Sequence, residues 1–141
     1  MSIGREDIAR RLPHGPAMVL LDHVESWDDD GITCLATSHR RHDNPLRRRG
    51  RLAVLSGVEY AAQAAALHGA GRTVPRAGQG AVLGSVGNVR TSRARLDGVE
   101  GELRVVVRIL HAQANGAAYS FSVGPVSGPT SVEGRFTVMY R

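Results

Sequence analysis

A single acidic residue stands inside the longest stretch of small and apolar residues in the chain. This stretch, RLAVLSGVEYAAQAAALHGAG, covers residues 51–71, and its only carboxylate is that of Glu59. A carboxylate in apolar surroundings is costly unless it has a partner or a chemical task. We therefore expect Glu59 to be buried and to act as an acid or a base, although capping a helix or pairing with an arginine would also explain it. Gln63 lies four residues later and shares its helix face.

The same stretch is expected to form one long helix over residues 53–70. It contains no proline, and alanine, its commonest residue, is the best helix former. Such a helix is roughly 25 Å long, and a helix that is apolar all round is buried. It is too short, and too polar at its centre, to span a membrane.

The rest of the chain reads as short elements arranged around this helix. Residues 2–12 have the spacing of an amphipathic helix, and alternation of apolar and polar residues indicates strands in the second half. Asp97-Gly98 and Asn115-Gly116 are hairpin signals. The predicted strands are 17–27, 32–38, 81–91, 103–112, 117–123 and 131–140.

This order predicts an α+β fold, in which an antiparallel sheet curls around one long central helix. A single helix cannot bury its whole circumference against a flat sheet, whereas a curled sheet encloses it. An edge strand of such a sheet needs cover, and pairing with a second subunit is a common solution.

Length and composition indicate one domain, 1–141, with a core of its own. No apolar run is long enough for a membrane span, and the charged N-terminus does not resemble a secretory signal. Cys34 is the only cysteine, so no internal disulfide and no metal site are expected. We expect a cytoplasmic protein.

The formal net charge is +5, and all 18 basic residues are arginine. They concentrate before the helix, at positions 40, 41, 47, 48, 49 and 51, and again at positions 90, 93 and 95. Such patches attract polyanions, but the chain has few aromatic residues and no nucleic-acid recognition motif. An acidic protein, a phosphate-bearing arm or solvent alone would fit the patches.

Two segments resemble the 3-hydroxyacyl-[acyl-carrier-protein] dehydratases of the hotdog fold. LPHGPAMVLLDHV at 12–24 is similar to their N-terminal signature, and SGVEYAAQAAALHGA at 56–70 to their central helix, with the acidic residue followed four places later by glutamine. DNPLRRRGRLAVLSGVEYAAQ resembles the branch found in aryl polyene clusters. The resemblance implies dehydration of 3-hydroxyacyl thioesters to trans-2-enoyl thioesters, with Glu59 and Gln63 in the site.

The chain departs from the family in the loop before the helix. The main family has a GHFPG-type loop whose histidine is the partner of the helix carboxylate, and no histidine stands at that place here. Since the LPH turn lines the acyl tunnel in the family, His14 becomes the first candidate for the missing partner. His39 and His42 are further candidates. His68 is expected to be a charge partner of the C-terminal end of the helix, and His23 and His111 are expected to have no role in the site.

Dehydration of a thioester needs an acid, a base and a group that holds the thioester oxygen. Burial would keep Glu59 protonated as the acid, and a neutral His14 imidazole would act as the base. The amides of Val54 and Leu55 at the helix start would polarise the carbonyl. Gln63 would orient Glu59, and no metal or redox cofactor is needed.

The resemblance also implies an acyl chain carried on the phosphopantetheine arm of an acidic acyl-carrier protein. Arg47, Arg48, Arg49 and Arg51 would receive that carrier at the tunnel mouth. A homodimer or a heterodimer with another hotdog subunit is expected, without nucleic acid or membrane as partners. Two alternatives stay open: a hotdog acyl thioesterase, and a non-catalytic subunit that pairs with a complete dehydratase.

Overall fold

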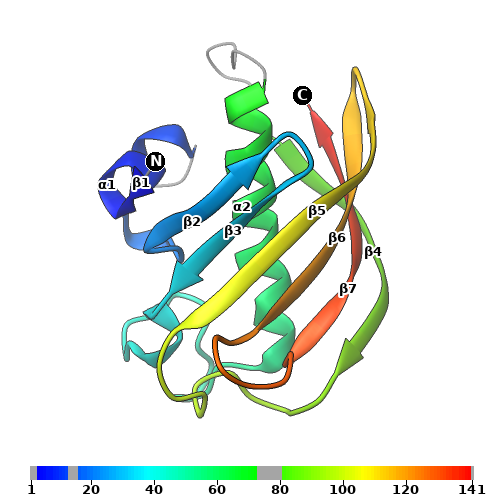
Figure 1. Ribbon diagram of the computed structural model, residues 1–141. Helices are drawn as coiled ribbons and strands as arrows, with labels where there is room; N and C mark the ends of the chain where they lie inside the picture. The colour runs from blue at the N-terminus through cyan, green and yellow to red at the C-terminus, as the bar shows by residue number, and fades with distance from the viewer. Residues whose placement is uncertain (1–2, 13–15, 73–80, 141) are drawn as a thin grey trace.

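The sheet curls around one long helix, α2 (Gly57–Arg72), which runs through its hollow side (Figure 1). The computed structural model describes residues 3–12, 16–72 and 81–140. Before α2 come the short helix α1 (Arg5–Arg11) and three strands, and after it come four longer strands. The strands are β1 (Ile3–Gly4), β2 (His23–Asp28), β3 (Gly31–Ala36), β4 (Ala81–Thr91), β5 (Leu103–Gln113), β6 (Gly116–Pro125) and β7 (Val132–Tyr140).

All seven strands belong to one antiparallel sheet with the order β1-β2-β3-β5-β6-β7-β4. β4 follows α2 in the chain but pairs with β7, so it forms one outer edge of the sheet. The α+β architecture predicted from the sequence, a curled antiparallel sheet around a central helix, is confirmed.

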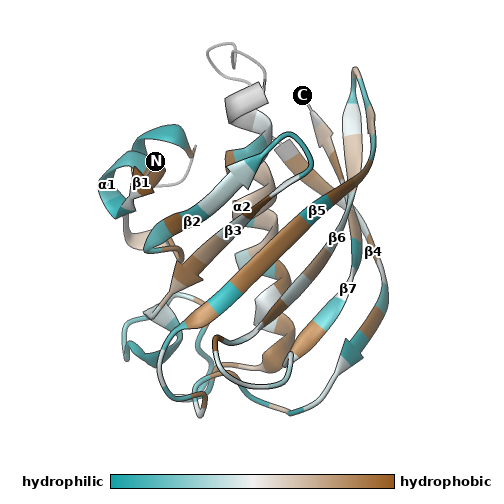
Figure 2. Ribbon diagram, in the orientation of Figure 1, coloured by the Kyte–Doolittle hydropathy of each residue, from teal (hydrophilic) through white to brown (hydrophobic). Residues whose placement is uncertain are grey.

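The core lies between α2 and the inner face of the sheet. Tyr60, Ala61, Ala64 and Leu67 of the helix are fully buried. The first half of β5 and most of β6 alternate between buried and less buried residues, so that every second residue there points to the helix. Figure 2 shows brown, apolar segments along β5. The inward residues include Val105, Val107, Tyr119, Phe121, Val123, Val132 and Phe136. Small helix residues let the strands approach closely, which explains the alanine-rich sequence.

The strand predicted over residues 17–27 is wrong in its first half. Residues Pro16–Met18 form a 3-10 turn, and β2 begins only at His23. The Gln63 side chain accepts a hydrogen bond from the Leu20 N–H at 2.9 Å and donates one to the Met18 carbonyl at 2.6 Å. A side chain from α2 therefore satisfies backbone groups that a neighbouring strand would otherwise pair.

Two other boundaries and one of the two hairpin signals also differ from the sequence prediction. The α-helix begins at Gly57, after a 3-10 turn over Val54–Ser56, and residues Ile3–Gly4 pair with β2 instead of opening α1. The Asn115-Gly116 signal does join two paired strands, β5 and β6. Asp97-Gly98 does not, because it lies between β4 and β5, which pair with other strands.

Asp97 instead fixes the approach to α2. Its carboxylate accepts the Leu52 N–H at 3.0 Å and pairs with Arg95, while the Leu96 N–H donates to the Leu52 carbonyl at 2.8 Å. The hydrogen bond from Arg95 is the main reason why the pKa of Asp97 lies well below its usual range. The loop before β5 thereby holds the segment that leads into the helix.

Asp97→Asn is expected to lower the free energy of unfolding by about 1–3 kcal/mol at pH 7, because the variant loses a charged hydrogen-bond acceptor. The ionised carboxylate stabilises the fold above its unfolded pKa of about 4, and this contribution is lost as pH falls through the lower folded value. The difference between the two proteins should thus shrink at pH 3, as measured by urea unfolding at both pH values. Asp43→Asn, at the exposed pair with Arg41, should change little. If Asp97→Asn and Asp43→Asn lower the free energy of unfolding equally, the stabilising role of the Asp97 carboxylate is contradicted.

Cys34 on β3 is fully buried, and burial raises the pKa of its thiol to about 12. Only the thiolate reacts with alkylating agents, so at pH 8 the reactive fraction is about one in ten thousand. Native protein should resist iodoacetamide at pH 8 and take up one equivalent once unfolded in guanidinium chloride, as mass spectrometry would show. Rapid labelling of the native protein would contradict the burial of this side chain.

None of the helices in the described ranges is long and apolar enough to cross a membrane. The described residues also contain no group of three or more histidine, cysteine, aspartate or glutamate side chains placed to hold a metal ion.

Candidate active site

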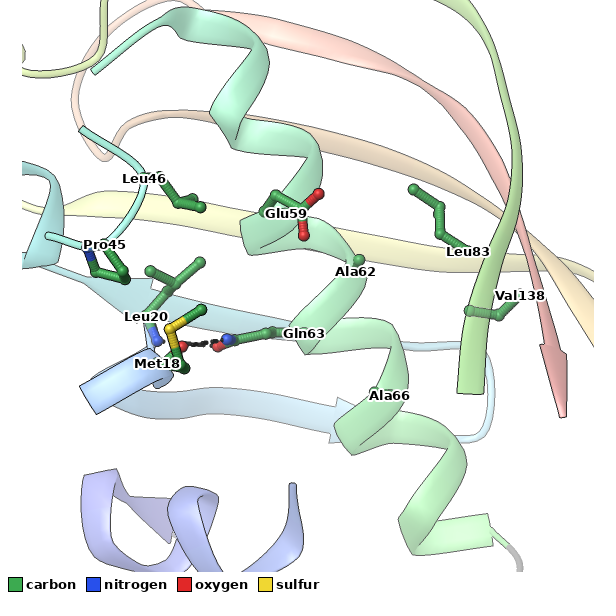
Figure 3. Close-up of a pocket in the computed structure, with 10 residues that line it drawn as sticks. All are labelled: Met18, Leu20, Pro45, Leu46, Glu59, Ala62, Gln63, Ala66, Leu83 and Val138. Atoms are coloured by element: carbon green, nitrogen blue, oxygen red, sulfur yellow. Dashed lines mark hydrogen bonds between the residues drawn. The ribbon is translucent and has the colours of Figure 1, made fainter. Parts of the chain in front are cut away.

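A narrow apolar cavity of about 150 Å³ lies along the side of α2 that the sheet leaves open (Figure 3). Its floor comes from the helix, one wall from the segments before the helix, and the other wall from the inner side of β4 and β7. The lining residues are Met18, Leu20, Pro45, Leu46, Glu59, Ala62, Gln63, Ala66, Leu83 and Val138.

Glu59 is the only ionisable residue among those that line this cavity. Figure 3 shows its carboxylate on the helix, between Leu46 of one wall and Leu83 of the other. The side chain is exposed in the single chain. The expectation of burial is therefore wrong for one chain: the small residues of α2 place Glu59 on the helix stripe that the sheet does not cover, not against the core.

Gln63 lines the same cavity one helical turn further on. Both ends of its amide are engaged by the backbone of Leu20 and Met18, as the dashed lines of Figure 3 show. Gln63 was expected to orient Glu59, but its amide is bound to the backbone of the neighbouring wall and not to the carboxylate. Gln63 instead holds in place the cavity wall that faces β4. It therefore positions the Met18–Leu20 segment and not the Glu59 carboxylate.

The two predicted oxyanion donors at the helix start differ. The Val54 N–H donates to the Ala94 carbonyl at 2.9 Å, so this amide is already paired and the expectation of a free donor is wrong. Leu55 lies in the same 3-10 turn, with a side chain that is 56% exposed on the open side of the molecule. Leu55 stays the candidate donor.

No imidazole of the described residues hydrogen-bonds to Glu59. His14, the first candidate partner, lies outside the described residues. His39 is fully buried and bonds to the Val99 carbonyl at 3.0 Å, and burial lowers the pKa of its imidazole. His68, expected at the C-terminal end of the helix as a charge partner, is fully buried and bonds instead to the Asp28 carbonyl of β2 at 2.9 Å. His42 is exposed on the loop.

A chain of buried hydrogen bonds fixes the walls of the cavity, and the sequence analysis did not identify it. Asn44 donates to the Tyr60 hydroxyl at 3.0 Å, Tyr60 and Ser38 share a bond of 2.7 Å, and Ser38 donates to the Leu20 carbonyl at 2.7 Å. Asn44 also accepts the Leu46 N–H at 2.8 Å. This Asn44–Tyr60–Ser38 chain ties both segments of one wall to α2. The sequence features that could have indicated this chain are Asn44 directly before a proline and Tyr60 as the single tyrosine of the helix.

The arginine-rich loop before α2 is mostly exposed. Arg48, Arg49 and Arg51 are exposed, while Arg47 folds back and donates to the carbonyls of Gly50 at 2.7 Å and His39 at 3.0 Å. Arg49 has a positive φ of 54°, and Arg48 and Arg51 form a β-bridge, so the loop is a tight turn. Arg47 thus serves the loop itself, and three guanidinium groups project from it.

The comparison with protein families decides the identity. Residues 6–140 match the model of the ApeP-like family, described as ApeP dehydratase. The chain belongs to the ApeP-like dehydratase family. The resemblance to the aryl polyene branch of hotdog dehydratases is therefore confirmed for nearly the whole chain. Among curated proteins, none matches this sequence.

Solved structures similar to this member of the ApeP-like family support the hotdog fold. The dehydratase heterocomplex ApeI:P from Xenorhabdus doucetiae includes a chain with 22% identity and a TM-score of 0.80, over 95% of this chain and 90% of that one. A thioesterase from Haemophilus influenzae has 14% identity and a TM-score of 0.68, over 99% and 91%. A thioesterase superfamily member from Mus musculus has 17% identity and a TM-score of 0.66, over 96% and 92%.

Proposed function

We propose that this ApeP-like protein dehydrates 3-hydroxyacyl thioesters to trans-2-enoyl thioesters, with Glu59 as the catalytic acid–base residue. The observation that carries the proposal is the position of Glu59: it is the one ionisable group in an apolar cavity whose other lining atoms suit an acyl chain. A lone carboxyl group in such surroundings can transfer a proton to a departing hydroxyl.

The cavity is suited to an acyl chain that lies along α2. Ala62 and Ala66 follow Glu59 on the open stripe of the helix and leave room above its backbone. Leu20 and Leu46 on one side and Leu83 on the other offer apolar contacts. The thioester would lie at the Glu59 end of the cavity. The amide of Leu55, four residues before Glu59 in the chain, would then be the donor to the carbonyl oxygen.

A second hotdog subunit would complete the site. Glu59 is exposed in the single chain, and β4, which contributes Leu83, is an edge strand with one unpaired side. Exposed apolar residues gather here, at Val82, Val86 and Val89 of β4 and at Met139 of the neighbouring β7. Such an edge favours pairing with another strand. A similar chain occurs in the dehydratase heterocomplex ApeI:P, so we infer a heterodimer with another hotdog subunit.

The base of the reaction would come from His14 or from that second subunit. None of the described histidines of this chain bonds to Glu59, and the two buried ones are held by backbone carbonyls. A neutral imidazole across the subunit boundary would complete the acid–base pair.

The experiment measures this chain alone, a complete hotdog dehydratase subunit alone, and the purified complex of both with a 3-hydroxyacyl thioester on carrier protein. The proposal is supported if the complex forms enoyl thioester faster than the complete subunit alone, and if the Glu59→Gln variant of this chain abolishes that increase in rate. Release of free thiol instead would identify a thioesterase.

A non-catalytic partner role is the second candidate, favoured because no histidine of the loop before α2 stands at the place that matches the catalytic histidine of the main family. Under that reading the complex forms and the second subunit gains stability, but Glu59→Gln leaves the turnover of the complex unchanged. This result would overturn the catalytic proposal while keeping the heterodimer.

Charge reversal at the exposed loop arginines tests the proposed docking of an acidic acyl-carrier protein. Arg48→Glu with Arg51→Glu should raise KM for a carrier-linked substrate by roughly tenfold or more, because carrier docking depends on charge complementarity. Turnover of a short free thioester should stay unchanged. Arg11→Glu on α1 is the matched control. An equal rise of KM for both substrates would refute carrier docking at this loop.

A further inference from the structure

A second hollow, of about 580 Å³, lies on the outer face of the sheet, away from α2. It crosses β4, β5, β6 and β7, the four strands on the right of Figure 1. Its lining residues are Asn88, Arg90, Val106, Arg108, Ser120, Phe121, Ser122, Glu133, Gly134 and Arg135. We name this hollow the outer trough.

The outer trough exists because the outward residues of β6 are all small. Ala118, Ser120 and Ser122 alternate with the buried residues of this strand. Long side chains stand at neighbouring registered positions: Arg108 and Arg135 on either side of Ser120, and Glu133 beside Ser122. Beside it, β4 has a register shift between Gly87 and Arg90, with Asn88 at a positive φ of 54°. Small floor residues and long rim residues give a groove on what would otherwise be a flat sheet.

The rim of the trough is positively charged. Arg90, Arg108 and Arg135 surround it, against a single carboxylate, that of Glu133. Arg108 has only a long pair with Asp28, at 3.8 Å, and both side chains of that pair are more than half exposed. Within the described part of the chain, Arg90 and Arg135 form no salt bridge. The guanidinium groups are therefore available to an anion.

The strand register places two of these arginines on either side of one serine. Arg108 pairs directly with Ser120, and Ser120 pairs directly with Arg135. Neighbouring strands lie about 4.8 Å apart, so the two arginine backbones are about 10 Å from each other with the hydroxyl midway. Guanidinium groups bind phosphate oxygens with paired hydrogen bonds, and a hydroxyl can donate another.

We propose that the outer trough binds the phosphate group of a soluble phosphorylated small molecule, held between Arg108 and Arg135 over Ser120. Arg90 and Asn88 at the bulge would contact the rest of the ligand. A second copy of this chain is a poor occupant, because two such faces would bring like charges together. The trough is also separated from Glu59 by the sheet, so it is not part of the cavity along α2.

The test titrates the full chain with inorganic pyrophosphate at constant ionic strength and follows the backbone amide signals by NMR. Shifts are expected for residues 106–108, 120–122 and 133–135. Arg108→Gln and Arg135→Gln should each weaken binding by roughly tenfold, since each removes a charge-assisted contact. Ser120→Val keeps the charge but fills the floor, and it should weaken binding as well.

Arg11→Gln, an equal charge change on the exposed face of α1, is the matched control and should leave binding unchanged. If Arg11→Gln weakens pyrophosphate binding as much as the trough variants do, the binding depends only on the net charge of the protein, and the proposal is overturned. Absence of shifts in the trough would overturn it too. Binding to phosphatidylglycerol vesicles without binding of pyrophosphate would replace the soluble ligand by a lipid surface.

Discussion

Glu59→Gln is expected to lower turnover of a 3-hydroxyacyl thioester by roughly 10²- to 10⁴-fold, the usual contribution of one acid–base group. Glutamine keeps the size of the side chain but transfers no proton. Because Glu59 is exposed on α2 and forms no hydrogen bond or salt bridge in the described chain, the fold should be unaffected. The measurement is enoyl formation by the heterocomplex, with the unfolding temperature of each variant as the check.

Glu100→Gln provides a control with the same chemical change on an exposed loop residue that does not line the cavity. It should leave both turnover and stability at the level of the unchanged protein. If Glu59→Gln and Glu100→Gln retain equal turnover, the acid of the reaction belongs to another residue, and the role of Glu59 in this subunit is excluded.

The strands of the second half could be predicted because their signal is local. Alternation in β5 to β7 follows from one face packing on α2, and each residue carries its own part of that signal. The strand predicted for the segment before β2 was wrong because the structure of that segment is not determined locally. Its backbone is held by Gln63, more than forty residues away in the sequence. The pattern of apolar and polar residues within the segment contains no information about so distant a hydrogen-bond partner.

The candidate site was foreseen only in part, and the reason lies in α2. A helix made of small residues on every side has no strong polar face. Its sequence therefore predicts a buried helix but does not indicate which side of the helix the sheet leaves uncovered. Glu59 lies on that open stripe, in line with Ala62 and Ala66. The opposite wall, with Leu83 and Val138, depends on β4 returning to pair with β7.

The Asn44–Tyr60–Ser38 chain has a definite direction. Ser38 gives its only hydroxyl proton to the Leu20 carbonyl, so in the bond between Ser38 and Tyr60 the donor is Tyr60. The Tyr60 oxygen then accepts from Asn44. Burial raises the pKa of Tyr60, which keeps its hydroxyl protonated as this order requires. Each group depends on the next one for its partner.

Tyr60→Phe is expected to lower the free energy of unfolding by about 1–3 kcal/mol, although it removes a single oxygen atom. The aromatic ring is kept, but the loss leaves one N–H of the buried Asn44 amide without its acceptor, and unpaired buried polar groups cost about that much. Since Asn44 holds Leu46 and Ser38 holds Leu20, the cavity wall should loosen, and KM should rise more than kcat falls. Chemical unfolding and steady-state kinetics give the two readouts.

A double-mutant cycle with Ser38→Ala separates the hydrogen-bond chain from simple packing. If the groups act as one unit, Tyr60→Phe in the Ser38→Ala background should cost less than in the unchanged protein, since neighbours in a network are not additive. Phe136→Leu, a change in the same core on β7 without any hydroxyl, should add fully to either variant. Full additivity between Tyr60→Phe and Ser38→Ala would show that the two hydroxyls act independently and would contradict a cooperative hydrogen-bond chain.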